Sequence, residues 1–353
     1  MDQIWWNKVT NAVRFVENIS ESINSGYSVI LQLPKYVPWY ASMMEIVNSY
    51  IMRDNSTRSF KKECDQGIEP GEYLINKFCK QEVRAHYRPG IGYPRFLAQI
   101  KEITLNQSIL WVSEVDAVQV KRWHSFITDY NKALEKNKTG GLFVIETNDI
   151  SLLKETKGIK LISYDDSIEE YDNYVFNMLA AAELKESKLF KQYLSEAVSS
   201  MLPDDIELAS ICISMGRKFL NNPIDKIRKA AKDNYRSDGT VFDVKESDEQ
   251  LKDRLWRAQI KIIFPLIEEH RNSVISKYKN QIEPLLPLRA AYGEEIDEVS
   301  GVELGTIAFL VTTGKIMVDA NDSDKIRLLK NMRNTLAHIG VIEQNDIDKL
   351  FGF

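Results

Sequence analysis

The chain has 353 residues, of which 44% are hydrophobic and 27% charged, and it carries a formal net charge of −5. This length allows two or three domains, and this composition is typical of globular proteins. The net negative charge argues against broad nonspecific binding to nucleic acid and leaves local basic patches open. The three cysteines have no metal-ligand spacing, so we expect neither a metal site nor a disulfide framework. No leader and no apolar run of about 18–20 residues is present, so we expect a cytoplasmic protein without a membrane partner.

The first elements of the chain predict a helix, a strand and a second helix. Apolar side chains over residues 4–24 have helical spacing, residues 27–33 form an apolar run typical of a buried strand, and a helix is expected over 39–52. The loop between them, residues 34–38, has the position of a phosphate-binding loop. It contains no glycine and no Gly-Lys-Ser/Thr, and the prolines on either side of Lys35 donate no N–H. We favour Lys35 as a solvated loop lysine over a vestigial nucleotide-binding residue.

Residues 54–95 give a weaker pattern, with a polar stretch, a weak helix over 73–78 and a loop rich in arginine and tyrosine at 86–95. Arginines interleaved with aromatic rings can neutralise nucleic acid and stack on its bases. A loop of this kind can equally pack on its neighbours, which is the interpretation we favour. The candidate nucleic-acid-binding residues are Arg84, Arg88, Tyr93 and Arg95.

Three further strands are expected over residues 108–116, 139–148 and 159–163, with helices over 96–105 and 117–134. Alternating strands and helices predict a parallel sheet whose functional edge lies at the carboxyl ends of the strands. Glu114 and Asp116 end one strand, and Thr147 and Asn148 end the next. We therefore expect these polar residues to gather at one edge of the sheet.

This order of elements resembles the P-loop ATPase core of the AAA+ and STAND classes, over about residues 25–165. The resemblance implies that Glu114 and Asp116 match the Walker B acids and that Asn148 matches the sensor of the γ-phosphate. The chain departs from the family at 33–42, where the Walker A glycines and Gly-Lys-Ser/Thr are missing. We therefore expect a degenerate domain that does not hydrolyse ATP and holds no cofactor, with ATP and Mg²⁺ as the alternative.

The remaining chain has helical periodicity. Residues 166–221 are expected to form a helical lid and 222–250 a charged linker, which we favour as a solvated helix and linker over a nucleic-acid patch. A long helix is expected over 251–283, kinked or split at Pro265, with others over 303–318 and 324–339. The predicted division is an α/β domain over 1–165, the lid, the linker and an all-α bundle of about four helices over 251–353.

The last long helix, expected to begin near Asp322 and end near Gly340, contains Arg333, Asn334 and His338. An Arg-Asn-x-x-x-His motif in a helical bundle resembles the HEPN domains of prokaryotic conflict proteins and CRISPR-associated ribonucleases, over about residues 251–345. In catalytic members two such motifs meet across a dimer and cleave RNA without a metal. The resemblance implies that His338 moves a proton, Arg333 stabilises phosphorane charge and Asn334 orients the phosphate.

Helix geometry limits what one chain can do. Asn334 and His338 are four residues apart and share a helix face, whereas Arg333 and His338 are separated by about 140°. Catalysis should therefore require a second chain, a distorted last turn or the full reach of the arginine. Two functions stay open: a defence-type ribonuclease effector that dimerises through its C-terminal bundle, or an inactive ATPase-like adaptor that binds protein, RNA or DNA partners.

Overall fold

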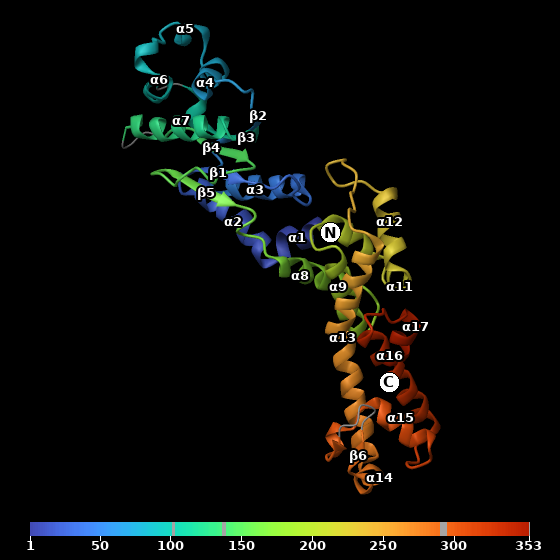
Figure 1. Cartoon of the computed structure of the whole chain (residues 1–353). Helices are drawn as coiled ribbons and strands as arrows, with labels where there is room; N and C mark the ends of the chain where they lie inside the picture. Colours follow the sequence, from blue (N-terminus) through green and yellow to red (C-terminus); the bar gives the residue numbers. More distant parts are fainter. Residues whose placement is uncertain (101–102, 136–138, 290–294, 353) are drawn as a thin grey trace. The chain divides into compact units, whose positions relative to one another are not determined.

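The computed structural model describes residues 1–100, 103–135, 139–289 and 295–352. Its backbone separates into two compact units, Met1–Asp172 and Asn173–Phe353, which are described in turn (Figure 1). Within the described ranges, none of the helices combines the length and the apolar character that crossing a membrane requires.

The first unit is built on a five-stranded parallel sheet with the order β2-β3-β4-β1-β5. This confirms the predicted α/β fold with a parallel sheet. The edge strand β2 was not predicted, because its residues are exposed or half-buried and three of them are charged. The strands are β1 (Ser28–Gln32), β2 (Ser59–Cys64), β3 (Ser108–Val115), β4 (Leu142–Thr147) and β5 (Ile159–Ser163).

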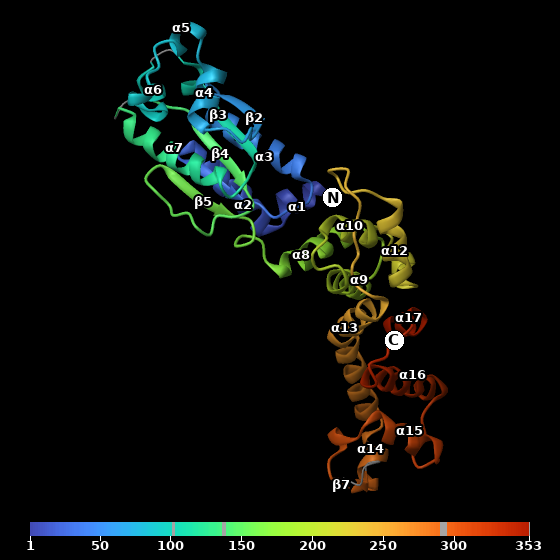
Figure 2. The ribbon, with the colours of Figure 1, turned by 45° about the horizontal axis from the view of Figure 1, so that its top comes forward.

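Helices cover both faces of this sheet (Figure 2). One face carries α2 (Thr10–Asn24) and α3 (Tyr40–Asp54), and α1 (Asp2–Lys8) packs against these two helices. The helix predicted over 4–24 is therefore two helices, α1 and α2, interrupted at Val9. The other face carries α4 (Pro70–Phe78), α6 (Tyr93–Gln99) and α7 (Gln119–Ala133). The short elements of this unit are α5 (Gln81–Arg84), η1 (Pro89–Ile91) and η2 (Thr104–Gln107).

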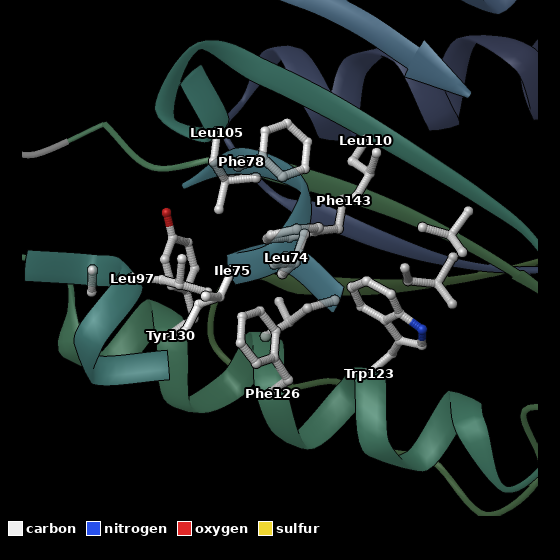
Figure 3. Close-up of a cluster of buried hydrophobic side chains, with 14 of the residues drawn as sticks. Leu74, Ile75, Phe78, Leu97, Leu105, Leu110, Trp123, Phe126, Tyr130 and Phe143 are labelled. Atoms are coloured by element: carbon white, nitrogen blue, oxygen red, sulfur yellow. The ribbon is translucent and has the colours of Figure 1, made fainter. Parts of the chain in front are cut away.

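The aromatic core beneath α7 packs that helix against the sheet. Trp123, Phe126 and Tyr130 have helical spacing and point from α7 toward Phe143 of β4 (Figure 3). Their ring centroids lie 6.0, 6.1 and 5.9 Å from that of Phe143. Each aromatic pair contributes about 0.5–1.5 kcal/mol beyond burial, so α7 is held firmly against β4.

The second unit is helical apart from a small hairpin, as predicted for the C-terminal region. Its long helix α13 begins with a capping box between Ser247 and Gln250, and α9 and α16 pack along it. The helices are α9 (Lys188–Met201), α10 (Ile206–Ser214), α11 (Arg217–Leu220), α12 (Pro223–Asp233), α13 (Asp248–Lys277), α14 (Lys279–Ile282), α15 (Leu304–Thr312), α16 (Ala320–Ala337) and α17 (Gln344–Phe351). The remaining elements are η3 (Glu283–Leu285), β6 (Leu288–Arg289), β7 (Glu295–Ile296) and η4 (Val299–Gly301), while α8 (Glu170–Ala181) spans the boundary between the units.

Two details of the second unit bear on the predictions. Pro265 was expected to kink or to split the long helix. The split is wrong, because α13 runs through Pro265 as one helix of 30 residues, and the kink stays a prediction. Proline removes one backbone donor, and the packing of α9 and α16 on α13 outweighs that loss. The charged segment 222–250 begins with a helix, α12, and its finer assignment as a linker between lid and bundle stays a prediction.

Candidate functional site

The carboxyl ends of β3, β4 and β1 lie side by side, since these strands are neighbours in the sheet. The register between β3 and β4 shifts between Val112 and Val115, which is a bulge in β3. Glu114 lies in this bulge with a left-handed φ of 61° and an exposed side chain. Asn148 is also exposed. Both therefore reach solvent at the edge where they were expected.

The Asp116 side chain bonds the backbone at the start of α7. Its Oδ1 accepts the backbone N–H groups of Val118 (2.7 Å) and Gln119 (2.8 Å). These two bonds hold the pKa of the Asp116 carboxyl below its usual value. Oδ1 is already bonded to the backbone at the start of α7. The role of Asp116 in a vestigial nucleotide site therefore stays a prediction, and it would use the other carboxylate oxygen.

The loop after β1 lacks the glycines of a phosphate-binding loop. It is tied down by two bonds, from Leu33 N–H to the Thr147 carbonyl (2.9 Å) and from the Trp6 indole N–H to the Pro38 carbonyl (3.0 Å). Trp39 has a φ of 46°, a left-handed conformation that glycine normally takes. Without glycines the backbone N–H groups cannot approach a phosphate closely, and the Lys35 side chain is exposed.

A buried carboxylate lies beside this loop, and the sequence analysis missed it. Glu146 of β4 is only 7% exposed, and its Oε1 accepts the Tyr40 hydroxyl (2.5 Å) and the Trp111 indole N–H (2.7 Å). Burial raises the pKa of the Glu146 carboxyl and also the pKa of the Tyr40 hydroxyl. A charged residue inside an otherwise apolar strand was the available signal. These side chains fill the space between the start of α3 and the sheet.

The arginine-rich loop is exposed, as nucleic-acid binding would require. Arg84, Arg88 and Arg95 are all exposed, and Arg88 also donates to the carbonyls of Ala85 and Tyr87. Tyr93, in contrast, is half-buried and stacks on Tyr87 with ring centroids 4.5 Å apart and planes inclined by 7°. One face of the Tyr93 ring is therefore used within the protein, and its binding to bases stays a prediction.

The C-terminal motif lies at the end of α16. Met332 and Leu336 are buried. Asn334 follows Met332 by two residues and His338 follows Leu336 by two, which is about 200° of helix rotation in each case. Both therefore project away from the buried face, and both are exposed. Arg333 is 40% exposed, and its guanidinium lies 3.8 Å from the Glu303 carboxylate. An exposed pair of this length adds little stability and leaves the guanidinium available.

The end of α16 is regular and well anchored. His338 N–H donates to the Asn334 carbonyl (3.1 Å), and Gly340 N–H folds back to the Thr335 carbonyl (2.8 Å). Ile339, between them, is left-handed with a φ of 58°. This pattern is a Schellman motif in which isoleucine takes the position usually held by glycine. Gly340 is required for another reason, because a Cβ there would lie 2.9 Å from the Thr335 carbonyl oxygen.

Two side chains of α13 hold the backbone before and after His338. The Trp256 indole N–H donates to the Leu336 carbonyl (2.9 Å). The buried Gln259 amide donates to the Ile342 carbonyl (2.9 Å) and accepts from the Ile342 N–H (2.8 Å). His338 keeps the helical bond from its N–H to the Asn334 carbonyl, but it is the C-cap residue of α16, with a φ of −100° and a ψ of 23°. It therefore lies just beyond the regular turns of the helix, and completion of the site by a second chain stays a prediction.

Among the described residues, no group of three or more His, Cys, Asp and Glu side chains could hold a metal ion. The three cysteines are all unpaired thiols. The chain matches no protein-family model, and a search of curated proteins finds none that is similar to it.

Proposed function

We propose that the second unit is a HEPN-like ribonuclease module that acts when two copies of the chain bring their α16 ends together. The observation that carries this proposal is the exposed end of α16, where Arg333, Asn334 and His338 are open to solvent on an anchored helix. A guanidinium, an amide and an imidazole are the groups needed to bind a phosphate and to move a proton.

The reaction that these groups suit is transesterification at an RNA phosphate. The 2′-hydroxyl oxygen bonds to phosphorus and gives its proton to one imidazole, while the bond to the 5′-oxygen breaks and that oxygen takes a proton from a second imidazole. Two copies of His338 would supply both, and Arg333 would stabilise the negative charge that develops on the phosphate oxygens. The products are a 2′,3′-cyclic phosphate and a 5′-hydroxyl.

The test is cleavage of labelled single-stranded RNA by the full chain. His338→Ala should lower the rate by about 10²–10⁴, and Arg333→Ala and Asn334→Ala should also lower it. The matched controls lie on the same helix and should retain full activity: Arg327→Ala, whose guanidinium pairs with Asp324, and Asn321→Ala in the first turn. Intact RNA with the wild-type chain over a range of protein concentrations, or cleavage that His338→Ala leaves unchanged, would refute the proposal.

A second candidate function is an adaptor that binds partners without cutting RNA. The loop after β1 favours it, because a nucleotide-driven enzyme needs a phosphate cradle that this loop lacks. We propose that the first unit is an ATPase-like domain that has no tight ATP site and does not hydrolyse ATP. Titration of the full chain with ATP and Mg²⁺ tests the first part, and binding at micromolar concentration that Lys35→Ala abolishes would contradict it.

A further inference from the structure

Charge is distributed unevenly along this acidic chain, and residues 76–95, called the basic segment below, carry the opposite sign. The segment contains five lysines and arginines and one acidic residue, Glu82, in a protein whose net charge is −5. In both views its helix α5 lies at the outer end of the first unit, beyond α4 and α6 (Figure 1 and Figure 2). A positive region of this kind is a candidate surface for an anionic partner.

Four of these five cations have no carboxylate partner within the described parts of the chain. Lys77 pairs with Glu63 (2.7 Å), whereas the other four are exposed. They are Lys80, Arg84, Arg88 and Arg95. Glu82 pairs with none of them, and Glu69, at the start of α4, is used as the cap of that helix. An anion from outside the chain can therefore pair with all four.

Hydrogen bonds place three of these cations close together. Arg84 N–H donates to the Lys80 carbonyl (3.0 Å), so these two side chains lie one helical turn apart on the same face. The Arg88 guanidinium folds back onto the carbonyls of Ala85 (2.8 Å) and Tyr87 (2.9 Å), which places it at the end of α5. Both bonds use its Nη1, and a guanidinium has five N–H groups, so donors remain for a ligand.

Two tyrosines of the basic segment tie the fourth cation to this group. Tyr87 stacks on Tyr93 with ring centroids 4.5 Å apart, and Arg95 follows Tyr93 by two residues in α6. Tyr93 also packs closely against α4, since a Cβ on Gly71 would lie 2.1 Å from the Tyr93 Cβ. The tyrosines therefore pack on their neighbours, and in doing so they hold Arg88 and Arg95 on a common support.

Without a partner this arrangement is electrostatically unfavourable. Like charges one helical turn apart repel each other. Arg95 lies in the first turn of α6, where the helix dipole disfavours a cation and no acidic residue offsets it. A bound anion would remove both costs, and the planar fork of arginine matches phosphate in particular, because it donates two parallel N–H bonds. We propose that the basic segment binds the phosphate backbone of a nucleic-acid strand.

A nucleic acid fits this surface better than an anionic membrane does. Segments that bind membrane surfaces insert large apolar side chains beside their basic ones. Among the described residues of the basic segment, Ile91 is the one large apolar side chain that is exposed, and only to 39%. Cations one helical turn apart instead suit a repeating polyanion. Because backbone phosphates carry no base identity, binding should be independent of base sequence and strongest at low salt.

The test is fluorescence anisotropy of the full chain with a labelled 2′-O-methyl RNA strand, which lacks the 2′-hydroxyl nucleophile and so separates binding from the proposed cleavage. Single-stranded DNA and duplex RNA are parallel arms that identify the nucleic acid. The logarithm of the affinity should fall with the logarithm of the salt concentration by about 0.7 for each phosphate contacted on a single strand, or about 3 for four contacts. The double variant Arg84→Ala/Arg95→Ala should weaken binding by about tenfold or more, reduce this slope by about 1.4 and keep the melting temperature.

The double variant Arg14→Ala/Arg53→Ala is the matched control, since both arginines are exposed and lie on α2 and α3, which cover the opposite face of the sheet. It removes the same charge and should leave the affinity nearly unchanged. Measurements in the Arg333→Ala background remove the phosphate contact proposed for the second unit. No binding of any strand up to about 10⁻⁴ M at low salt would overturn the proposal. So would equal weakening by the two double variants, or vesicles containing phosphatidylserine binding more tightly than every strand.

Discussion

Replacing Gln259 by leucine should destabilise the second unit strongly. Gln259 is 1% exposed and makes three hydrogen bonds, two to the backbone of Ile342 and one, of 3.0 Å, to the Tyr193 hydroxyl. Leucine is similar in size and leaves the N–H and carbonyl of the buried Ile342 unpaired. Each unpaired buried group costs about 1–3 kcal/mol. The leucine side chain recovers a part of this free energy by burying apolar surface, so we expect the free energy of unfolding to fall by about 3–4 kcal/mol.

The chain contains a matched control for this substitution. Gln281 makes the same pair of bonds to the backbone of Met317, at 3.0 and 2.7 Å, but both residues are exposed. Water can replace those bonds, so Gln281→Leu should cost about 1 kcal/mol or less. Urea denaturation of the full chain measures both losses, and hydrogen exchange in peptides covering 339–347 localises the first. Equal losses in the two variants would refute the assignment of Gln259 as the anchor of this segment.

Three further predictions concern other buried or strained positions. Burial raises the pKa of the Glu146 carboxyl in the folded protein above its ordinary value. The folded protein is therefore most stable when Glu146 is protonated, and it loses stability as the pH rises from the ordinary carboxyl pKa through the raised pKa. Glu146→Gln should remove that loss in urea titrations at several pH values, whereas Glu146→Leu should cost about 2–4 kcal/mol by leaving the Tyr40 and Trp111 donors unpaired. Gly340→Ala should cost about 1–3 kcal/mol through its contact with Thr335, and Gly305→Ala, whose Cβ meets nothing within 4 Å, should cost nothing. Ile339→Gly should raise the melting temperature, because relief of a left-handed isoleucine gains about 1 kcal/mol and the side chain is 62% exposed; a lower melting temperature would contradict the strain argument.

The sequence predicted the elements whose signal is local. The strand over 159–163 and the helix that carries Arg333 follow from periodicity and end signals that lie within a few residues of each other. The strand β2 was missed because an edge strand is half-solvated, and Lys61, Lys62 and Glu63 hide its alternation. The split at Pro265 was wrongly allowed because the helices α9 and α16 that pack along α13 lie far away in sequence.

The site residues divide in the same way. The Arg-Asn-x-x-x-His motif could be recognised from the sequence. The side chains that hold its backbone could not, because Trp256 and Gln259 lie about 80 residues before the carbonyls to which they donate. The helix was expected to end near Gly340; in the structure Ile339 takes the left-handed conformation at this end, and Gly340 allows the close approach to Thr335. Glu146 was visible as a charge in a buried strand, but its donor Tyr40 belongs to another element.

The residues that hold the backbone of the candidate nuclease site differ from those proposed to carry its chemistry, so the chemistry can be tested separately from stability. The backbone on either side of His338 is held by Trp256 and Gln259, whereas Asn334 and His338 are exposed and Arg333 forms only a long ion pair. Substitutions at exposed positions away from caps and buried networks usually change stability by less than about 0.5 kcal/mol. Alanine at Arg333 and Asn334 should therefore leave the fold intact. His338 is the C-cap residue of α16, so its alanine variant requires urea denaturation beside the cleavage assay. A loss of RNA cleavage at unchanged stability would report on the chemistry of the end of α16 and not on unfolding.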